Sequence, residues 1–279
     1  MTERVIGEKE IKLFAQHLNQ EEKSAATIEK YLRDARAFMV YVGSNNVTKE
    51  VVKDYKKDLR EKGYAIRSIN SMISSLNSMF DFLEWSDCKV KLIKQQKEIY
   101  CASEKELTRA EYIRLIDAAK KNAQLQLVMQ TICATGIRVS ELRYFTVEAV
   151  KQGEVTVSCK GKIRKILIPS KLRKLLLTFA QKEKIPSGVI FITRKGEPLN
   201  RSYIWSKMKS LCTEAGVNAC KVFPHNLRKL FARTFYGIEK DIAKLADILG
   251  HSNINTTRIY IMTTGKEHRK MIEQLGLVV

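Results

Sequence analysis

The sequence has no uninterrupted apolar run that approaches the roughly 20 residues of a membrane-spanning helix. Its first residues, MTERVIGEKEIK, lack the apolar core of a signal peptide. Six cysteines occur without a CxxC pair, which fits reduced thiols better than disulfides or a zinc site. No GxxxxGKS/T or GxGxxG loop is present, so a nucleotide-hydrolysing site has no support. We therefore expect a soluble cytoplasmic protein that needs no metal or other cofactor.

Acidic residues are scarce in the second part of the chain. Overall, 50 Lys and Arg stand against 30 Asp and Glu, which gives a formal net charge of +20. Residues 1–103 hold 18 basic and 15 acidic side chains, whereas residues 104–279 hold 32 and 15. Such an excess predicts a polyanion partner, with solubility alone as the alternative interpretation.

One stretch of this second part, between Glu154 and Glu183, has no acidic residue at all. A solvated face usually mixes both signs, so the stretch predicts a surface that faces phosphates. Its basic residues are Lys160, Lys162, Arg164, Lys165, Lys171, Arg173, Lys174 and Lys182.

Apolar residues recur at helical spacing through the first part of the chain, which predicts a four-helix domain over residues 1–88. The expected helices are 8–18, 25–42, 48–62 and 66–85.

The fourth of these helices carries many serines and asparagines beside its apolar stripe. Short hydroxyls and amides are poor helix formers, so they either contact DNA closely or let another helix approach. We predict Ser68 and Ser71 as DNA contacts, together with Lys30 of the second helix.

Residues 89–103 have weak periodicity and are expected to link this domain to a second one, residues 104–279. Thr108 and Glu111 form a capping box at the start of the second domain. Alternating residues predict two strands around the CKGKI turn, 154–158 and 164–169, and a third short strand, 189–193. The other expected elements are helices at 125–134, from about 139, and at 171–182, 201–215, 225–235, 238–249, 255–261 and 266–275. The fold class is therefore mainly α with a small β-sheet.

Four short segments of the second domain hold residues suited to phosphate chemistry. They are ATGIRVSEL (134–142), CKGK (159–162), HNLR (225–228), and LGH (249–251) followed by TTRIY (256–260). Each is weak alone: Arg138 and Glu141 fit a surface pair, a lone histidine fits a cap, and Tyr260 is one of ten tyrosines. Their joint occurrence, in one order within one basic domain, indicates a single site.

These segments resemble the signature boxes of the tyrosine recombinase (phage integrase) family, with matching order and spacing through residues 108–262. The segment TIEKYLRDARAF resembles the core-DNA-binding domain of that family, and the length resembles compact Xer-like or mobile-element integrases. The resemblance implies an N-terminal SAM-like core-DNA-binding domain and a C-terminal DNA breaking-rejoining catalytic domain.

The resemblance further implies Tyr260 as the nucleophile, within a set of catalytic residues that surrounds the scissile phosphate. The other members are Arg138, Lys160, His225, Arg228 and His251. A tyrosine of pKa about 10 needs proton removal and a positive environment to attack a phosphodiester. Guanidiniums offer forked donors to the phosphate oxygens and replace a metal clamp. The product that the resemblance implies is a 3′-phosphotyrosyl intermediate, whose retained bond energy would allow rejoining without ATP.

The choice of catalytic lysine stays open, and one position departs from the family's pattern. Lys160 precedes the glycine of the turn as in the family, but Lys162 is the alternative catalytic lysine. Lys229 stands where relatives often have another histidine, which predicts altered packing beside Arg228. Further DNA contacts are predicted at Lys162, Arg164, Lys165 and Arg201.

The expected partner is double-stranded DNA with inverted half-sites, bound by a dimer per site and a homotetramer on two sites, with accessory proteins possible and no membrane. Residues 266–275 either pack on their own domain or dock on the neighbouring protomer. We expect a nucleoid-associated enzyme of DNA integration, excision or resolution.

Two rival functions remain. A type IB topoisomerase uses a similar centre and would relax DNA without sequence preference. A non-catalytic regulator would use Asp241–Ile261 as a helix-turn-helix, which leaves the joint presence of Arg138, Arg228 and Tyr260 unexplained.

Overall fold

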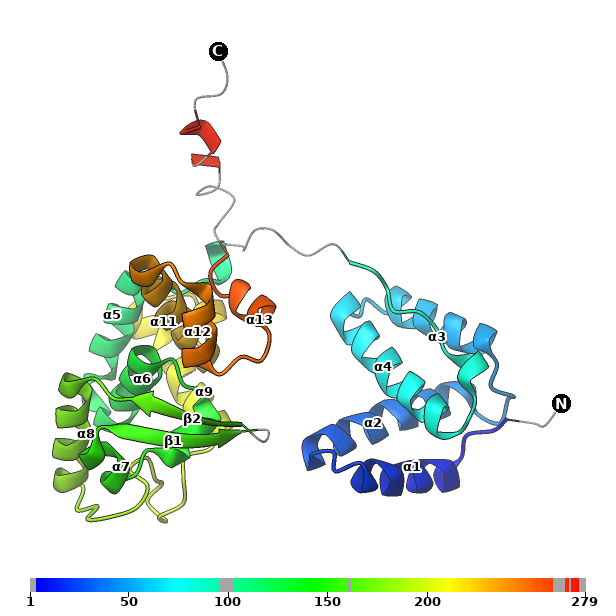
Figure 1. The fold of residues 1–279 in the computed structure, drawn as a ribbon, viewed down its shortest axis with the longest axis horizontal. Coiled ribbons are helices and arrows are strands. Elements are labelled where there is room, and N and C mark those ends of the chain that lie inside the picture. Colours follow the sequence, from blue (N-terminus) through cyan, green and yellow to red (C-terminus); the bar gives the residue numbers. More distant parts are fainter. Residues whose placement is uncertain (1–3, 96–102, 160–161, 263–268, 271, 276–279) are drawn as a thin grey trace. The chain divides into compact units, whose positions relative to one another are not determined.

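The computed structural model describes residues 4–95, 103–159, 162–262, 269–270 and 272–275. The chain divides into two compact units, Met1–Lys97 and Glu98–Val279, and each is described by itself (Figure 1). Helices dominate both, and the sheet is one two-stranded hairpin in the second unit, which confirms the predicted fold class. Within the described ranges, no helix has both the length and the apolar character needed to cross a membrane.

The first unit is a four-helix domain built around one apolar core. Its helices are α1 (Glu8–Gln20), α2 (Ala25–Val42), α3 (Lys49–Glu61) and α4 (Ile66–Phe82), followed by a 3-10 turn at Ser86–Cys88. Each helix is amphipathic, and Phe14, Phe38 and Phe80 are completely buried where the apolar faces meet.

Two asparagines of α4 have partners in the segment that follows the helix. The amides of Asn70 and Asn77 each donate to and accept from the backbone, at Ile93 and Val90 respectively. The segment 90–93 is thereby bound along α4, so the unit continues beyond residue 88, where we predicted the first domain to end.

A buried carboxylate joins α2 to α4. Asp34 is 2% exposed and accepts from Ser75 at 2.9 Å, while Lys30 lies 3.0 Å from it and donates to the carbonyl of Ser71. The hydroxyl of Ser75 therefore serves close helix approach. Ser68 is exposed.

The second unit surrounds a larger apolar core, with α6 and α11 in close contact at its centre. Its helices are α5 (Arg109–Ala118), α6 (Ala123–Thr135), α7 (Val147–Gln152), α8 (Ser170–Lys182), α9 (Arg201–Ser210), α10 (Cys212–Ala215), α11 (Pro224–Glu239), α12 (Ile242–Leu249) and α13 (Ile254–Arg258). Strands β1 (Glu154–Cys159) and β2 (Lys162–Leu167) pair antiparallel, from Glu154 opposite Leu167 to Cys159 opposite Lys162. The capping box of Thr108 and Glu111 is confirmed at the start of α5.

Two expectations about this unit are wrong, and a third is refined. Residues 189–193 form only isolated bridges, Thr146 with Val189 and Ile192 with Pro198, because loop residues rather than a strand lie beside them. The helix expected from about 139 begins at Val139 and is a 3-10 helix, Val139–Tyr144. The predicted helix 201–215 is interrupted at Leu211.

The break between α11 and α12 lies further along the chain than predicted. Helix α11 runs through Gly237 to Glu239 and ends on Lys240, whose φ is +59°. Asp241 then caps α12 by accepting from the backbone N–H groups of Ala243 and Lys244. The predicted helix 266–275 lies partly outside the described residues.

Two left-handed glycines shape the turns that bear the functional residues. Gly136 ends α6 with φ +65°, and a Cβ there would lie 2.3 Å from Cδ1 of Phe231. Gly250 ends α12 with the same φ. Only glycine adopts this backbone freely, so the turns before Arg138 and His251 both depend on it.

Candidate active site

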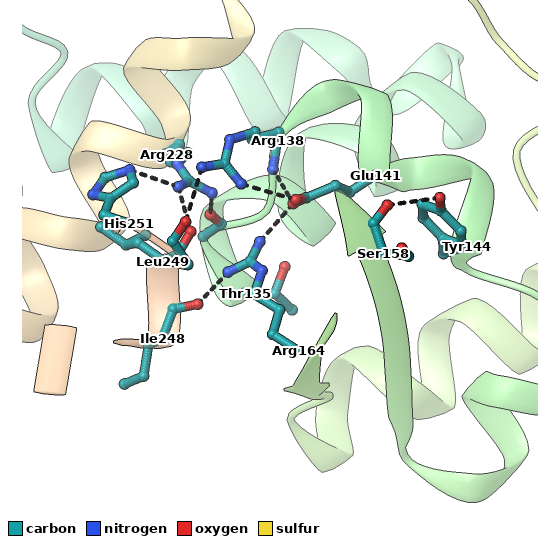
Figure 2. A network of polar contacts seen from close by, with 12 residues as sticks. Thr135, Arg138, Glu141, Tyr144, Ser158, Arg164, Arg228, Ile248, Leu249 and His251 are labelled. Carbon is teal, nitrogen blue, oxygen red and sulfur yellow. Dashed lines mark hydrogen bonds and ion pairs between the residues drawn. The ribbon is translucent and has the colours of Figure 1, made fainter. Parts of the chain in front are cut away.

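Three of the four predicted segments, all except CKGK, bring their residues to one place in the second unit. Arg138 follows the turn after α6, Arg228 lies in α11, and His251 follows α12; Figure 2 shows them in one network of polar contacts. His225 lies one helical turn before Arg228, and Tyr260 follows α13.

Arg228 is an almost completely buried charge of this network, at 1% exposed. Its guanidinium donates to the carbonyl of Gly136, to that of Leu249 at 2.7 Å and to Nε2 of His251 at 3.0 Å. Within the described residues, its Nε has no hydrogen-bond partner. Burial, followed by the positive charge of Arg138, lowers the pKa of Arg228 to about 10, so the group stays charged at neutral pH.

Arg138 is held by a buried glutamate and by the turn after α12. Its Nη1 lies 3.0 Å from Oε1 of Glu141, and its Nη2 donates to the carbonyl of Gly250 at 3.2 Å. Glu141 is 1% exposed and also accepts from the backbone N–H of Arg138 at 2.7 Å. The Arg138 side chain remains 35% exposed, so it can also reach an anion from solvent.

The other oxygen of Glu141 accepts from Arg164 of β2 at 2.6 Å. Arg164 also donates to the carbonyl of Ile248 at the end of α12, and its side chain is 14% exposed. This residue, which we predicted as a DNA contact, therefore has its guanidinium inside the protein network (Figure 2).

The hydrogen bonds of His251 fix its tautomer. Arginine only donates, so Nε2 of His251 must accept from Arg228. The proton of the neutral ring is then on Nδ1, which donates to Oγ1 of Thr257 at 2.8 Å. Thr257 is completely buried and precedes Tyr260 by less than one helical turn, so the same contact ties the tyrosine segment to the site.

Tyr260 is 6% exposed and belongs to a small apolar cluster with Ala232, Leu245 and Leu249. Its ring meets His225 edge to face at a centroid distance of 5.1 Å and His251 at 5.2 Å. The tyrosine thus lies between both predicted histidines of its own chain.

Both histidines are held in the neutral form in this setting. Desolvation, and then the nearby cations Lys229 and Arg228, lower the pKa of His225 to about 4, while its side chain keeps access to solvent. Burial and then Arg228 likewise lower the pKa of His251 to about 4. Both rings are therefore neutral at pH 7.

These shifts predict that the second unit loses stability in mild acid. An unfolded histidine titrates near 6.5, so between about 6.5 and 4 the unfolded chain binds protons that the folded site rejects. We expect the urea concentration at the unfolding midpoint to be lower at about pH 5 than at about pH 7. Unfolding is followed by Trp205 fluorescence in a Trp85→Phe variant. The difference between the two midpoints should be smaller in a variant that has glutamine in place of both His225 and His251. Equal midpoints at the two pH values would contradict the shifts.

A pocket of about 310 Å³ opens beside Arg138 and His225. Arg201 and Trp205 of α9 also line it. Trp205 is 49% exposed, and no feature of the sequence had distinguished it from an ordinary packing residue. Both Arg138 and His225 therefore border a cavity in the second unit.

Other predicted residues are placed elsewhere. Lys160 lies outside the described residues, as does the side chain of Lys162 at the start of β2. Lys165 is exposed and pairs with Glu154 at 2.7 Å, away from the network. Ser68, Ser71 and Lys30 belong to the first unit.

The site therefore defines a class of enzyme. A tyrosine next to neutral imidazoles and two guanidiniums suits phosphoryl transfer to a phenol oxygen. Residues 105–267 match the phage integrase family, and residues 11–87 match the N-terminal SAM-like domain of phage integrases. The chain belongs to the phage integrase family of tyrosine recombinases, which are enzymes that break and rejoin DNA.

Curated relatives match over most of their length. Tyrosine recombinase XerA of Pyrococcus furiosus is 29% identical, and the match covers 100% of this chain and 98% of XerA. Tyrosine recombinase XerD of Vibrio cholerae is 25% identical, with 84% of each chain covered.

Solved structures share the fold. A lambda integrase dimer bound to a core site superposes with a TM-score of 0.75 at 18% identity, covering 93% of this chain and 96% of that one. XerH recombinase bound to its difH substrate gives 0.71 at 16% identity, covering 96% and 84%.

Proposed function

We propose that this enzyme is a site-specific DNA recombinase in which Tyr260 attacks a phosphate held by Arg138 and Arg228, leaving a 3′-phosphotyrosyl intermediate. The observation that carries the proposal is the position of Tyr260 between His225 and His251 of the same chain. The biological role is integration, excision or resolution of DNA, in the cytoplasm with the nucleoid.

His225 is the general base in this proposal. The structure shows no hydrogen bond to its ring within the described residues, and its lowered pKa keeps a nitrogen free to accept the phenol proton at pH 7. His251 is less suited, because its Nε2 already accepts from Arg228. His251 instead orients that guanidinium.

The guanidiniums stabilise the charge that develops on the phosphate. Arg228 is fixed by backbone carbonyls before DNA arrives, so its donors need little reorganisation. As the Tyr260 oxygen bonds to phosphorus, the bond to the 5′ oxygen breaks, and that oxygen takes a proton from Lys160 or Lys162. Reversal with a new 5′-hydroxyl rejoins the strands.

We propose a dimer on each pair of inverted half-sites and a tetramer on two sites, joined by residues 266–275. Support comes from relatives of the same fold: lambda integrase has been crystallised as a dimer on a core site and as a tetramer bound to a Holliday junction.

The test uses a nicked suicide substrate carrying inverted half-sites, selected from a randomised library. The nick lets a short fragment leave after cleavage, so the covalent adduct accumulates. Trypsin cleaves after Arg258 and Lys266, and the resulting peptide, IYIMTTGK, contains only one tyrosine. We expect the nucleotide on that peptide by mass spectrometry. Attachment to another peptide would reject the assignment of Tyr260.

The same experiment separates the rival functions. A topoisomerase would form the adduct and relax supercoiled plasmids that lack the selected site. A DNA-binding regulator would bind without forming any adduct. Helices α12 and α13 are joined through Gly250 as a helix-turn-helix would be, but the turn positions His251 against Arg228.

A further inference from the structure

The hairpin carries one guanidinium that turns inward. Arg164 of β2 contacts two separate parts of the site: it donates to Glu141 at 2.6 Å and to the carbonyl of Ile248, the second-last residue of α12. Its neighbours along the strand, Ile163 and Lys165, are exposed. The alternation of the strand therefore sends Arg164 toward α12, where it is 14% exposed.

We propose that Arg164 is a positioning residue that aligns Arg138 and the His251 turn with the hairpin, and that it does not contact DNA. The inference deepens the proposed function, because it concerns the same site and reaction.

The first part of this role acts through Glu141. That carboxylate is 1% exposed and shared between two arginines, with Oε1 on Arg138 and Oε2 on Arg164. Without Arg164, Oε2 of this buried carboxylate keeps the backbone N–H of Arg138 but loses its charged partner, which is costly. The Arg138 guanidinium is then drawn to bind both oxygens in a fork, and its donors turn away from the phosphate.

The second part acts through the turn after α12. A Cβ on Gly250 would lie 2.7 Å from Cδ of Arg164, so the backbone of this turn rests directly on the arginine side chain. The carbonyl of Gly250 also accepts from Arg138, and the next residue is His251. Arg164 thus supports the turn after α12, which positions both Arg138 and His251.

A DNA contact and a positioning residue leave different signatures. A lost phosphate contact weakens binding and reduces the slope of log Kd against log salt by about 0.9. A misaligned site lowers the cleavage rate at saturating DNA instead, and a displacement of about 1 Å can cost about 100-fold.

The experiment compares Arg164→Gln and Arg164→Lys with wild type on the suicide substrate. For Arg164→Gln, we expect adduct formation at saturating DNA to slow about 100-fold, with Kd within about twofold and an unchanged salt slope. Arg164→Lys keeps the charge without the fork, so it should recover part of the rate. In a Glu141→Gln background, replacing Arg164 should cost much less, because the shared carboxylate is already gone.

Arg114→Gln is the matched control. Arg114 of α5 also donates to backbone carbonyls at the end of another helix, Ala215 and Gly216, and these bonds involve no member of the network. The rate of adduct formation by Arg114→Gln should stay within about twofold of wild type. If Arg164→Gln misfolds by circular dichroism, the lysine variant supplies the same comparison of rate and salt slope.

A smaller salt slope with a normal rate at saturation would overturn the inference and identify Arg164 as a DNA contact. An unchanged rate and slope would overturn it as well. Failure of the proposed function is distinct, because wild type itself would then form no adduct at Tyr260.

Discussion

Replacing Tyr260 with phenylalanine should abolish the covalent adduct while leaving DNA affinity within about twofold of wild type. The change removes one oxygen and keeps the ring that packs between His225 and His251, so the apolar cluster around it survives. Without the phenol there is no nucleophile, and cleavage should fall by at least about 10⁴-fold, to the detection limit of a single-turnover gel assay.

Tyr236→Phe is the matched control for this prediction. Tyr236 lies in α11 and packs against the same cluster as Tyr260, so its substitution repeats the loss of a hydroxyl without touching the proposed nucleophile. It should retain wild-type cleavage. Residual adduct from Tyr260→Phe would mean that another side chain attacks the phosphate.

Replacing Arg228 with lysine should slow cleavage about 1000-fold, equivalent to about 4 kcal/mol of transition-state stabilisation. The guanidinium spans the carbonyls of Gly136 and Leu249 and the ring of His251. An ammonium is a compact charge without a planar fork, so it cannot keep these three partners and also serve a phosphate.

The rate is measured by single-turnover cleavage at saturating DNA, beside thermal unfolding and gel-shift affinity. Arg114→Lys makes the same chemical change at an arginine that is outside the network, and it should cleave normally. If Arg228→Lys cleaved within about tenfold of wild type, the proposed phosphate clamp would be wrong.

Local patterns predicted most of the fold. The helix at 25–42 agrees with α2 at both ends, and the capping box of Thr108 sets the start of α5. The sequence failed where structure depends on distant partners. Residues 189–193 have the composition of a strand, and Ile190 is completely buried, yet its N–H bonds to the carbonyl of Phe145 in a loop. Burial alone does not make a strand, because a ladder also needs a neighbouring strand.

The site shows the same division. Motif order indicated Arg138, His225, Arg228, His251 and Tyr260, and the structure brings these five together. The order of the motifs did not indicate which contacts hold these residues in place. Glu141 fitted a surface pair with Arg138 three residues away, but it is buried and also accepts from Arg164, which is 23 residues further along the chain. Spacing within one helical turn reveals the contact of Glu141 with Arg138, but it cannot reveal the contact of Glu141 with Arg164.

The binding of segment 90–93 along α4 decides where this protein can be divided for domain exchange. Val90 is 6% exposed and belongs to the core of the first unit, and the amides of Asn70 and Asn77 are saturated by the backbone of Val90 and Ile93. A graft that joins a foreign catalytic domain directly after Cys88 would expose that core and leave both amides without their backbone partners. A junction placed after Ile93 keeps Val90 in the core and both amides paired with the backbone.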